Sequence, residues 1–165
     1  SPFRGLGGYM IEIFTDGASS GNPGPGGYGV ILRSGQHYKE LSAGYRKTTN
    51  NRMELLAVIK GLEALKNLNQ NVTIFSDSKY VIDAIEKRWV YGWLQKGFKD
   101  KKNKDLWLRY LEISKLQNIK FNWVRGHAGH PENERCDVLA VAAGKQKDLL
   151  IDSVFEMESA KVNLL

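Results

Sequence analysis

The sequence predicts an α/β fold: a five-stranded mixed sheet, built from a three-strand antiparallel meander and two parallel strands, with helices on both faces. Three observations support this prediction. Three strand-like segments come first, separated only by turns. Segments with helical spacing of apolar residues then alternate with two more strands. Finally, 165 residues with 42% hydrophobic content can form one domain around a single core.

The first predicted strand, residues 11–17, is the element around which the others are arranged. Ile11, Ile13 and Phe14 supply apolar side chains to both faces of a sheet strand, and Gly17 favours a turn directly after Asp16. Open α/β sheets bind their ligands at the carboxyl ends of strands. Asp16 is therefore the first candidate for a functional residue.

Residues 18–29 are rich in glycine and proline and resemble a phosphate-binding loop in composition. However, they lack the pattern G-x-x-x-x-G-K-[ST]. They also lead into a strand, residues 28–33, where a nucleotide loop would lead into a helix. We therefore assign no nucleotide phosphate to them. A turn at residues 34–35 connects to a third strand, residues 37–45, which completes the meander.

The first long helix is predicted after the polar residues 48–51, because Thr and Asn are typical N-cap residues. Its apolar side chains recur at the i, i+3, i+4 and i+7 spacing of a helix with one buried face. These apolar residues are Leu55, Val58, Ile59, Leu62 and Leu65.

The second half of the chain alternates helices with two more strands. We predict strands over residues 72–76, directly before Asp77, and over residues 119–124. Helices are predicted over residues 78–88, over residues 105–116 and from Pro131 onward, since proline suits a first helical position. The resulting order is βββαβααβα.

We expect one domain, residues 10–144, with a short extension at each end. Residues 1–9 are Gly-rich and unpatterned, so we interpret them as a remnant of cloning or a disordered leader before Met10. Residues 145–165 contain apolar side chains without a clean period. We leave open whether this C-terminal tail packs on the domain or is disordered.

Composition indicates where the protein functions. No apolar run approaches the roughly 20 residues of a membrane span, and the N-terminus lacks the features of a signal peptide. The single cysteine, Cys136, cannot form an internal disulfide, which agrees with a reducing compartment. We therefore expect a cytoplasmic protein without a membrane association. We also expect a monomer without an obligate protein partner.

The net charge of +6 is concentrated in one segment. Residues 87–104, the basic segment below, hold seven basic residues and one acidic residue, so they account for the whole charge excess. Aromatic residues lie between these cations. This combination is typical of surfaces that hold a sugar-phosphate backbone, which we favour over aromatic side chains that only pack on each other. The candidate substrate-binding residues here are Lys87, Arg88, Trp89, Trp93, Lys96, Lys99, Lys101 and Lys102.

Three further acids are expected near Asp16. Asp77 ends a strand predicted to run parallel to the first, so both acids reach one edge of the sheet. Glu54 and Asp137 each flank the apolar stripe of a helix that faces the sheet. One such acid alone is usually a cap or a solvated surface group. Four converging carboxylates repel one another unless they hold a cation, and hard oxygen ligands favour Mg²⁺ or Mn²⁺.

His127 lies in a Gly-flanked loop that precedes Asp137. It could transfer protons there, although a loop histidine is as often a capping or surface residue. A zinc site with His130 and Cys136 is a weaker alternative, because the spacing matches no common zinc pattern and a fourth ligand is missing. We interpret Cys136 as a core residue.

Four segments carry a resemblance to a known family. They are I-F-T-D-G-A-S-S-G-N-P-G-P-G-G-Y-G, T-T-N-N-R-M-E-L, F-S-D-S-K-Y-V and G-H-A-G-H-P-E-N-E-R-C-D. From Met10 to about Gly144 the chain resembles bacterial type 1 ribonuclease H almost throughout, and residues 10–144 would then be the catalytic domain. Two departures concern substrate binding: the stretch after Phe98 is shorter than in well-known members, and Lys79 replaces a common Gln.

The resemblance implies a ribonuclease H-like fold and an endonuclease that hydrolyses the RNA strand of RNA–DNA hybrids, leaving 3′-hydroxyl and 5′-phosphate ends. It implies two Mg²⁺ ions, which Mn²⁺ could replace, held by Asp16, Glu54, Asp77 and Asp137. It implies a catalytic role for His127. It identifies the basic segment with a helical protrusion that grips the DNA strand. The remaining substrate contacts that it implies are Asn22, Thr49, Asn50 and Asn51.

Two other functions remain as alternatives. The first is a module that binds hybrids or double-stranded RNA but has lost catalysis, which the presence of all four acids disfavours. The second is a relative of the same fold that acts on DNA, such as a transposase or a junction nuclease. The asparagine-rich segment and the basic segment argue against it.

Overall fold

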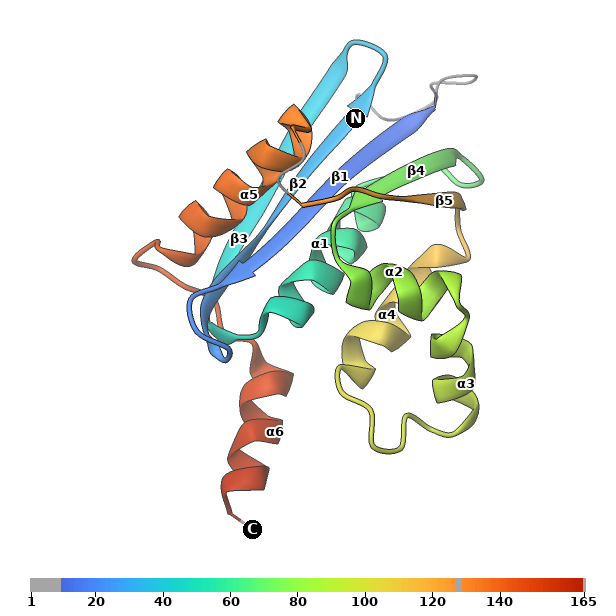
Figure 1. The fold of residues 1–165 in the computed structure, drawn as a ribbon. Helices are drawn as coiled ribbons and strands as arrows, with labels where there is room; N and C mark the ends of the chain where they lie inside the picture. The colour runs from blue at the N-terminus through green and yellow to red at the C-terminus, as the bar shows by residue number, and fades with distance from the viewer. Residues whose placement is uncertain (1–9, 127–128, 165) are drawn as a thin grey trace.

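The computed structural model describes residues 10–126 and 129–164 (Figure 1). The predicted leader, residues 1–9, and His127 lie outside the described residues. The strands are β1 (Ile11–Ser19), β2 (Gly24–Ser34), β3 (His37–Thr48), β4 (Asn71–Ser76) and β5 (Asn118–Trp123). The helices are α1 (Asn50–Glu63), α2 (Lys79–Glu86), α3 (Trp89–Gln95), α4 (Lys104–Ser114), α5 (Pro131–Gly144) and α6 (Ser153–Asn163).

The strands form one mixed sheet in the order β3-β2-β1-β4-β5. β1 pairs antiparallel with β2, and β2 pairs antiparallel with β3. β4 pairs parallel with β1 on its other side, and β5 pairs parallel with β4. The predicted fold class, a three-strand meander extended by two parallel strands, is therefore confirmed.

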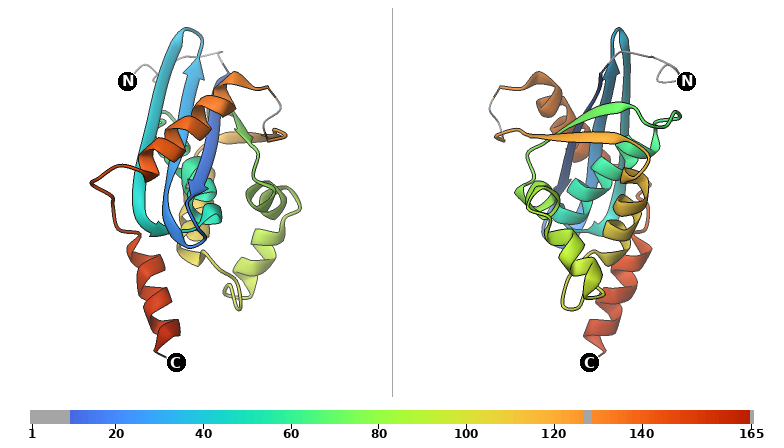
Figure 2. Two further views of the ribbon diagram at one scale, coloured as in Figure 1. Left: turned by 60° about the vertical axis from the view of Figure 1, so that its left-hand side comes forward. Right: turned by 90° about the vertical axis from the view of Figure 1, so that its right-hand side faces the viewer.

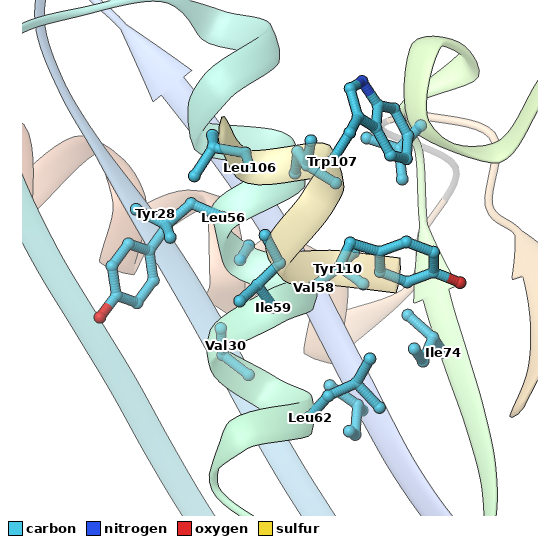
Figure 3. Close-up of a cluster of buried hydrophobic side chains, with 14 of the residues drawn as sticks. Tyr28, Val30, Leu56, Val58, Ile59, Leu62, Ile74, Leu106, Trp107 and Tyr110 are labelled. Atoms are coloured by element: carbon cyan, nitrogen blue, oxygen red, sulfur yellow. The ribbon is translucent and has the colours of Figure 1, made fainter. Parts of the chain in front are cut away.

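Helices cover both faces of the sheet, α1 on one face and α5 on the other (Figure 2). Alternation along β1 decides which side chains face which helix, since Ile13 joins the larger core and Phe14 the smaller one. The larger core lies on the α1 side and includes α4 through Trp107 and Tyr110 (Figure 3). The smaller core contains Cys136, whose predicted place in the core is confirmed.

Close backbone contacts hold both helices against the sheet. A Cβ atom on Gly17 of β1 would clash with the backbone of α1 at Met53 and Glu54. A Cβ atom on Gly29 of β2 would clash with the carbonyl of Cys136 in α5. Glycine allows these approaches because it has no side chain, and each contact lies beside an acid proposed for the site.

The residue pattern did not predict two helices, α3 within the basic segment, where only the resemblance implied a helical protrusion, and α6 within the C-terminal tail. α3 has seven residues, too few for a helical period to be recognised, and α6 buries none of its residues. α6 extends away from the body of the molecule (Figure 1). The chain before it is attached to the sheet through a bridge between Tyr45 of β3 and Leu150. No helix within the described residues combines the length and apolar character that crossing a membrane requires.

Candidate active site

Three acidic side chains meet at one edge of the sheet. Asp16 lies in β1, Glu54 lies in α1, and Asp77 directly follows β4. One carboxylate oxygen from each lies within 4.8 Å of the others. The parallel register places Phe14 beside Phe75, so the acids two residues further along both chains reach the same edge. The predicted meeting of these three acids is thus present in the structure.

Burial strongly affects the charge of this cluster. Asp16 and Glu54 are only 7% and 5% exposed. Burial raises the pKa of Asp16 from 3.8 to about 8, and the negative charge of Asp77 adds to the rise. Burial also raises the pKa of Glu54 well above 4.5, and Asp16 and Asp77 reinforce the effect. Such carboxylates coexist only when protons or cations compensate their charge.

The donor set of the cluster fits a hard divalent cation. Glu54 Oε2 is buried and has no hydrogen-bond partner among the described residues. Asp16 is oriented by the backbone N–H of Gly17, which donates to its Oδ1 at 2.9 Å. Clustered carboxylate oxygens beside space for water form the environment that Mg²⁺ and Mn²⁺ prefer. The three acids could therefore hold a divalent metal ion.

The acids line a pocket of about 380 Å³, which Asp137 also lines from α5. Asp137 lies close enough to Asp16 for its charge to contribute to the raised pKa of Asp16. The fourth predicted acid thus lies at the same pocket as the cluster of three. Asn50, Arg125 and Gly126 also contribute to the lining.

Ion pairs and a thiol hydrogen bond determine where α5 presents Asp137. Arg135 donates two hydrogen bonds to Glu40 of β3, at 2.7 and 3.0 Å. Glu132, in the first turn of α5, pairs with Arg33 of β2. The Cys136 thiol donates to the carbonyl of Phe14 at 3.3 Å. The burial of its thiol in this contact argues against Cys136 as a zinc ligand.

Sequence reasoning missed two polar residues of α5 that line the pocket, Asn133 and Glu134. Both amide atoms of Asn133 are buried and have no hydrogen-bond partner among the described residues. The two residues lie four and three positions before Asp137, which places all three on one face of the helix. This helical spacing from Asp137 is the sequence signal that could have identified Asn133 and Glu134. His130, the N-cap of α5, also lines the pocket, whereas the predicted catalytic residue His127 lies outside the described residues.

The predicted polar contacts cluster at the start of α1. The side chain of Thr49 caps the helix by accepting a hydrogen bond from the N–H of Arg52 at 3.2 Å. Asn22 Oδ1 accepts from the N–H of Asn50 at 3.0 Å, which ties the β1–β2 loop to this turn. Asn50 lines the pocket of the acids, and Asn51 lines a neighbouring cavity. The structure therefore brings these four residues together, and Asn50 places the group at the pocket of the acids.

The basic segment forms α3 and the loop that leads to α4. Its cations lie over aromatic rings: Lys87 Nζ is 5.1 Å from the centre of the Trp89 ring, and Lys101 Nζ is 5.1 Å from that of Trp93. Trp89 is 48% exposed, whereas Phe98 is buried in the core. Some aromatic residues of this segment therefore pack into the core, whereas others stay accessible to a ligand.

Two cavities are associated with the basic segment. One, of about 370 Å³, is lined by Arg88, Trp89, Gly92, Trp93, Lys96, Lys99 and Lys101. The other, of about 460 Å³, lies between this segment and the starts of α1 and α2. Its lining includes Asn51, Lys79, Tyr80, Trp89, Trp93, Lys101, Lys102 and Asn103. Every predicted cation or tryptophan of the segment except Lys87 therefore lines one of the two cavities.

Comparisons with known proteins agree with this arrangement. The family model described as RNase H matches residues 9–145. A protein named Ribonuclease H from Desulforamulus reducens is 60% identical over 147 residues, which cover 86% of this chain and 92% of that protein.

Two solved structures that resemble this chain are also RNase H proteins. LC9-RNase H1, described as a type 1 RNase H with the type 2 active-site motif, superposes with a TM-score of 0.73 at 31% identity. The match covers 94% of this chain and 82% of that one. LC11-RNase H1, solved in complex with an RNA/DNA hybrid, has a TM-score of 0.58 at 26% identity, covering 81% of this chain and 95% of that one.

Proposed function

The chain belongs to the ribonuclease H family, and we propose that it is an endonuclease that hydrolyses the RNA strand of RNA–DNA hybrids, leaving 3′-hydroxyl and 5′-phosphate ends. The observation that carries this proposal is the cluster of Asp16, Glu54 and Asp77, with carboxylate oxygens within 4.8 Å of one another. The related LC11-RNase H1, which was solved with a bound hybrid, supports the choice of substrate.

In this proposal the acids hold two Mg²⁺ ions, which Mn²⁺ could replace. Asp16, Glu54 and Asp77 would be ligands, and Asp137 would extend the set from α5. The bound ions would supply an activated water and stabilise the charge on the leaving oxygen. The protein holds the ligands in place through buried elements, so little reorganisation is needed when the substrate arrives.

The polar turn at the start of α1 gives the proposed selectivity for RNA. Asn50 lines the same pocket as the acids, and Asn22 fixes its backbone. Asn side chains and backbone groups can donate to and accept from a 2′-hydroxyl, which a deoxyribose strand lacks. We place Asn22, Thr49, Asn50 and Asn51 as contacts to the strand that is cut.

One gel tests the proposal. A labelled RNA–DNA hybrid, an RNA duplex and a DNA duplex are each incubated with the protein, in Mg²⁺ and in EDTA. We expect cleavage of the RNA strand of the hybrid in Mg²⁺ only. Binding of the hybrid without cleavage would favour the non-catalytic module, and cleavage of the DNA duplex would favour a relative that acts on DNA.

Replacement of four lysines of the basic segment by glutamine is expected to weaken hybrid binding and flatten its dependence on salt. For each lysine that no longer neutralises a phosphate, the slope of log K against log salt falls by about 0.7 to 0.9, because fewer counterions are released. Turnover at saturating substrate should change less. The four lysines are Lys96, Lys99, Lys101 and Lys102.

A charge-matched variant controls for the change in net charge. It replaces four exposed lysines outside the basic segment, for which we expect a salt slope close to that of the unaltered protein. If both variants have the same slope, the basic segment is not the docking surface. The control lysines are Lys39, Lys66, Lys120 and Lys147.

His127→Ala is expected to lower kcat by about tenfold or more and to leave KM nearly unchanged, if His127 moves protons or assists product release. Steady-state kinetics on the hybrid measure both constants. His37→Ala, at the start of β3, is the matched control and should retain full activity. An unaltered kcat in His127→Ala would return this residue to a capping or surface role.

A further inference from the structure

Arg52, in the first turn of α1, is buried to 2% exposure although it is charged. Its guanidinium donates to Asp152 from Nε at 2.7 Å and from Nη2 at 2.9 Å. It donates to Asp105 from Nη1 at 2.9 Å and from Nη2 at 2.7 Å. A further bond runs from Nη1 to Asn103 Oδ1 at 3.3 Å. The bonds that a guanidinium can donate are therefore all used, in two bidentate pairs and one additional contact.

These partners come from distant parts of the chain. Asp105 and Asn103 lie at the start of α4, where the basic segment ends, and Asp152 belongs to the C-terminal tail. Asp152 also accepts a hydrogen bond from Thr48 at 2.8 Å, directly before the polar turn at the start of α1. Arg52 therefore joins three segments: the turn of residues 49–51, the end of the basic segment, and the tail.

The first two of these segments line the same cavity. Asn51, the neighbour of Arg52, and Asn103, its hydrogen-bond partner, both line the cavity of about 460 Å³. Asn103 in turn donates to the hydroxyl of Tyr80 at 2.9 Å, which extends the network to α2. The position of one wall relative to the other thus depends on the hydrogen bonds of Arg52.

The network depends on both carboxylates. Burial alone lowers the pKa of Arg52, but the hydrogen bonds to Asp105 and Asp152 outweigh burial and raise it. A buried charge that is deprived of one partner carries an uncompensated cost, so the loss of either carboxylate would destabilise the contacts that Arg52 makes between these segments. Neutralising Asp152, which lies well away from the carboxylate cluster in the sequence, would therefore disturb the cavity walls.

We propose that Arg52, clamped by Asp105 and Asp152, is a positioning residue for the substrate: it sets the spacing between the 49–51 turn and the basic segment, so that the C-terminal tail supports hybrid affinity without contacting the hybrid. The inference rests on the proposed function, since it takes the hybrid as the substrate. It assigns a functional role to a tail whose helix α6 buries no residue.

Asp152→Asn tests the proposal against a charge-matched control, Glu156→Gln. Glu156 belongs to the same tail, and its carboxylate pairs with Arg46, which is 56% exposed, and not with Arg52. Each substitution removes one negative charge, which by itself should tighten the binding of a polyanion. Hybrid affinity is measured by fluorescence anisotropy in EDTA, and kcat is measured in Mg²⁺, at a temperature where circular dichroism shows the variants folded.

We expect Asp152→Asn to raise the Kd for the hybrid about three- to tenfold, against the direction of the charge change, with little change in kcat at saturation. Glu156→Gln should keep the Kd of the unaltered protein. A Kd in Asp152→Asn that equals that of the unaltered protein overturns the proposal. Equal weakening in both variants also overturns it, because it would assign the effect to the tail as a whole and not to Arg52.

Asp105→Asn provides an independent second variant, which is decisive if Asp152→Asn does not fold. It removes the other carboxylate, 26% exposed, and it should raise the Kd in the same direction. An unaltered Kd in this variant would contradict the positioning role of Arg52. Failure of the unaltered protein to bind the hybrid would instead contradict the proposed function itself.

Discussion

Asp16→Asn is expected to abolish cleavage of the hybrid and, in EDTA, to raise the melting temperature. The variant keeps the shape of the side chain but removes one of three ionisable carboxyl groups whose oxygens lie within 4.8 Å of one another. Cleavage should fall by at least about a thousandfold, and the melting temperature should rise by about 2–4 °C for each kcal/mol of repulsion removed. Activity and stability are opposed at such a site.

The raised pKa of Asp16 fixes how this gain in stability depends on pH. Its folded-state pKa is about 8 and its ordinary value is 3.8. At lower pH than both values, the carboxyl is protonated in the folded and unfolded states, so it does not oppose folding. Between pH 3.8 and about 8, Asp16 is ionised in the unfolded chain but still protonated in the folded chain. Because the folded state binds more protons over this range, the free energy of unfolding falls as the pH rises toward 8. The advantage of Asp16→Asn in EDTA should therefore grow over this range and then level off.

Thermal melts with and without Mg²⁺ check this expectation. Mg²⁺ should stabilise the unaltered protein by mass action and the variant much less. Asp148→Asn, which neutralises an exposed acid of the tail, is the control and should change neither activity nor melting temperature. If Asp16→Asn melts clearly lower than the unaltered protein in EDTA, Asp16 has a structural partner and the picture of repelling acids is wrong.

Gly17→Ala should impair both stability and cleavage, although it adds only a methyl group. The new Cβ atom would clash with the backbone of Met53 and Glu54, and it would lie 2.9 Å from Glu54 Cα. Because backbone atoms cannot rotate away, α1 must move off β1, which separates Glu54 from Asp16. We expect stability to fall by about 2–3 kcal/mol, which lowers the melting temperature by about 5–10 °C, and cleavage to fall about a hundredfold.

Gly92→Ala is the matched control for this substitution. A Cβ atom on Gly92, in α3, meets no atom within 4 Å. Alanine favours a helix by up to about 1 kcal/mol over glycine, so this variant should melt at the same temperature as the unaltered protein or higher. Equal melting temperatures for Gly17→Ala and Gly92→Ala would show that the contact between β1 and α1 tolerates a side chain.

The fold class and the carboxylate cluster could be predicted because their signals are local. Asp16 and Asp77 each follow a short apolar strand, and the pairing rules for such strands place both at one edge of the sheet. Glu54 could be placed from the period of its own helix. These inferences needed no knowledge of which distant residues would touch.

Arg52 could not be identified in the same way. A basic residue in the first turn of a helix is usually exposed. Its burial depends on Asp105 and Asp152, which lie 53 and 100 residues further along the chain. The helix α6 was missed for a related reason: its start is held by an ion pair between Glu156 and Arg46, 110 residues apart, and not by a periodic apolar face.

The attachment of the tail to β3 also covers part of a sheet edge at which another chain could pair. β3 and β5 form the two edges of the sheet, and β5 is only six residues long and carries Lys120, both of which discourage pairing with another chain. β3 has twelve residues. Part of its outer edge is covered by Leu150, which donates to the Gly44 carbonyl at 2.8 Å and accepts from the Arg46 N–H at 2.9 Å. A chain shortened before Leu150 would expose these groups and offer β3 as a template for intermolecular strand pairing.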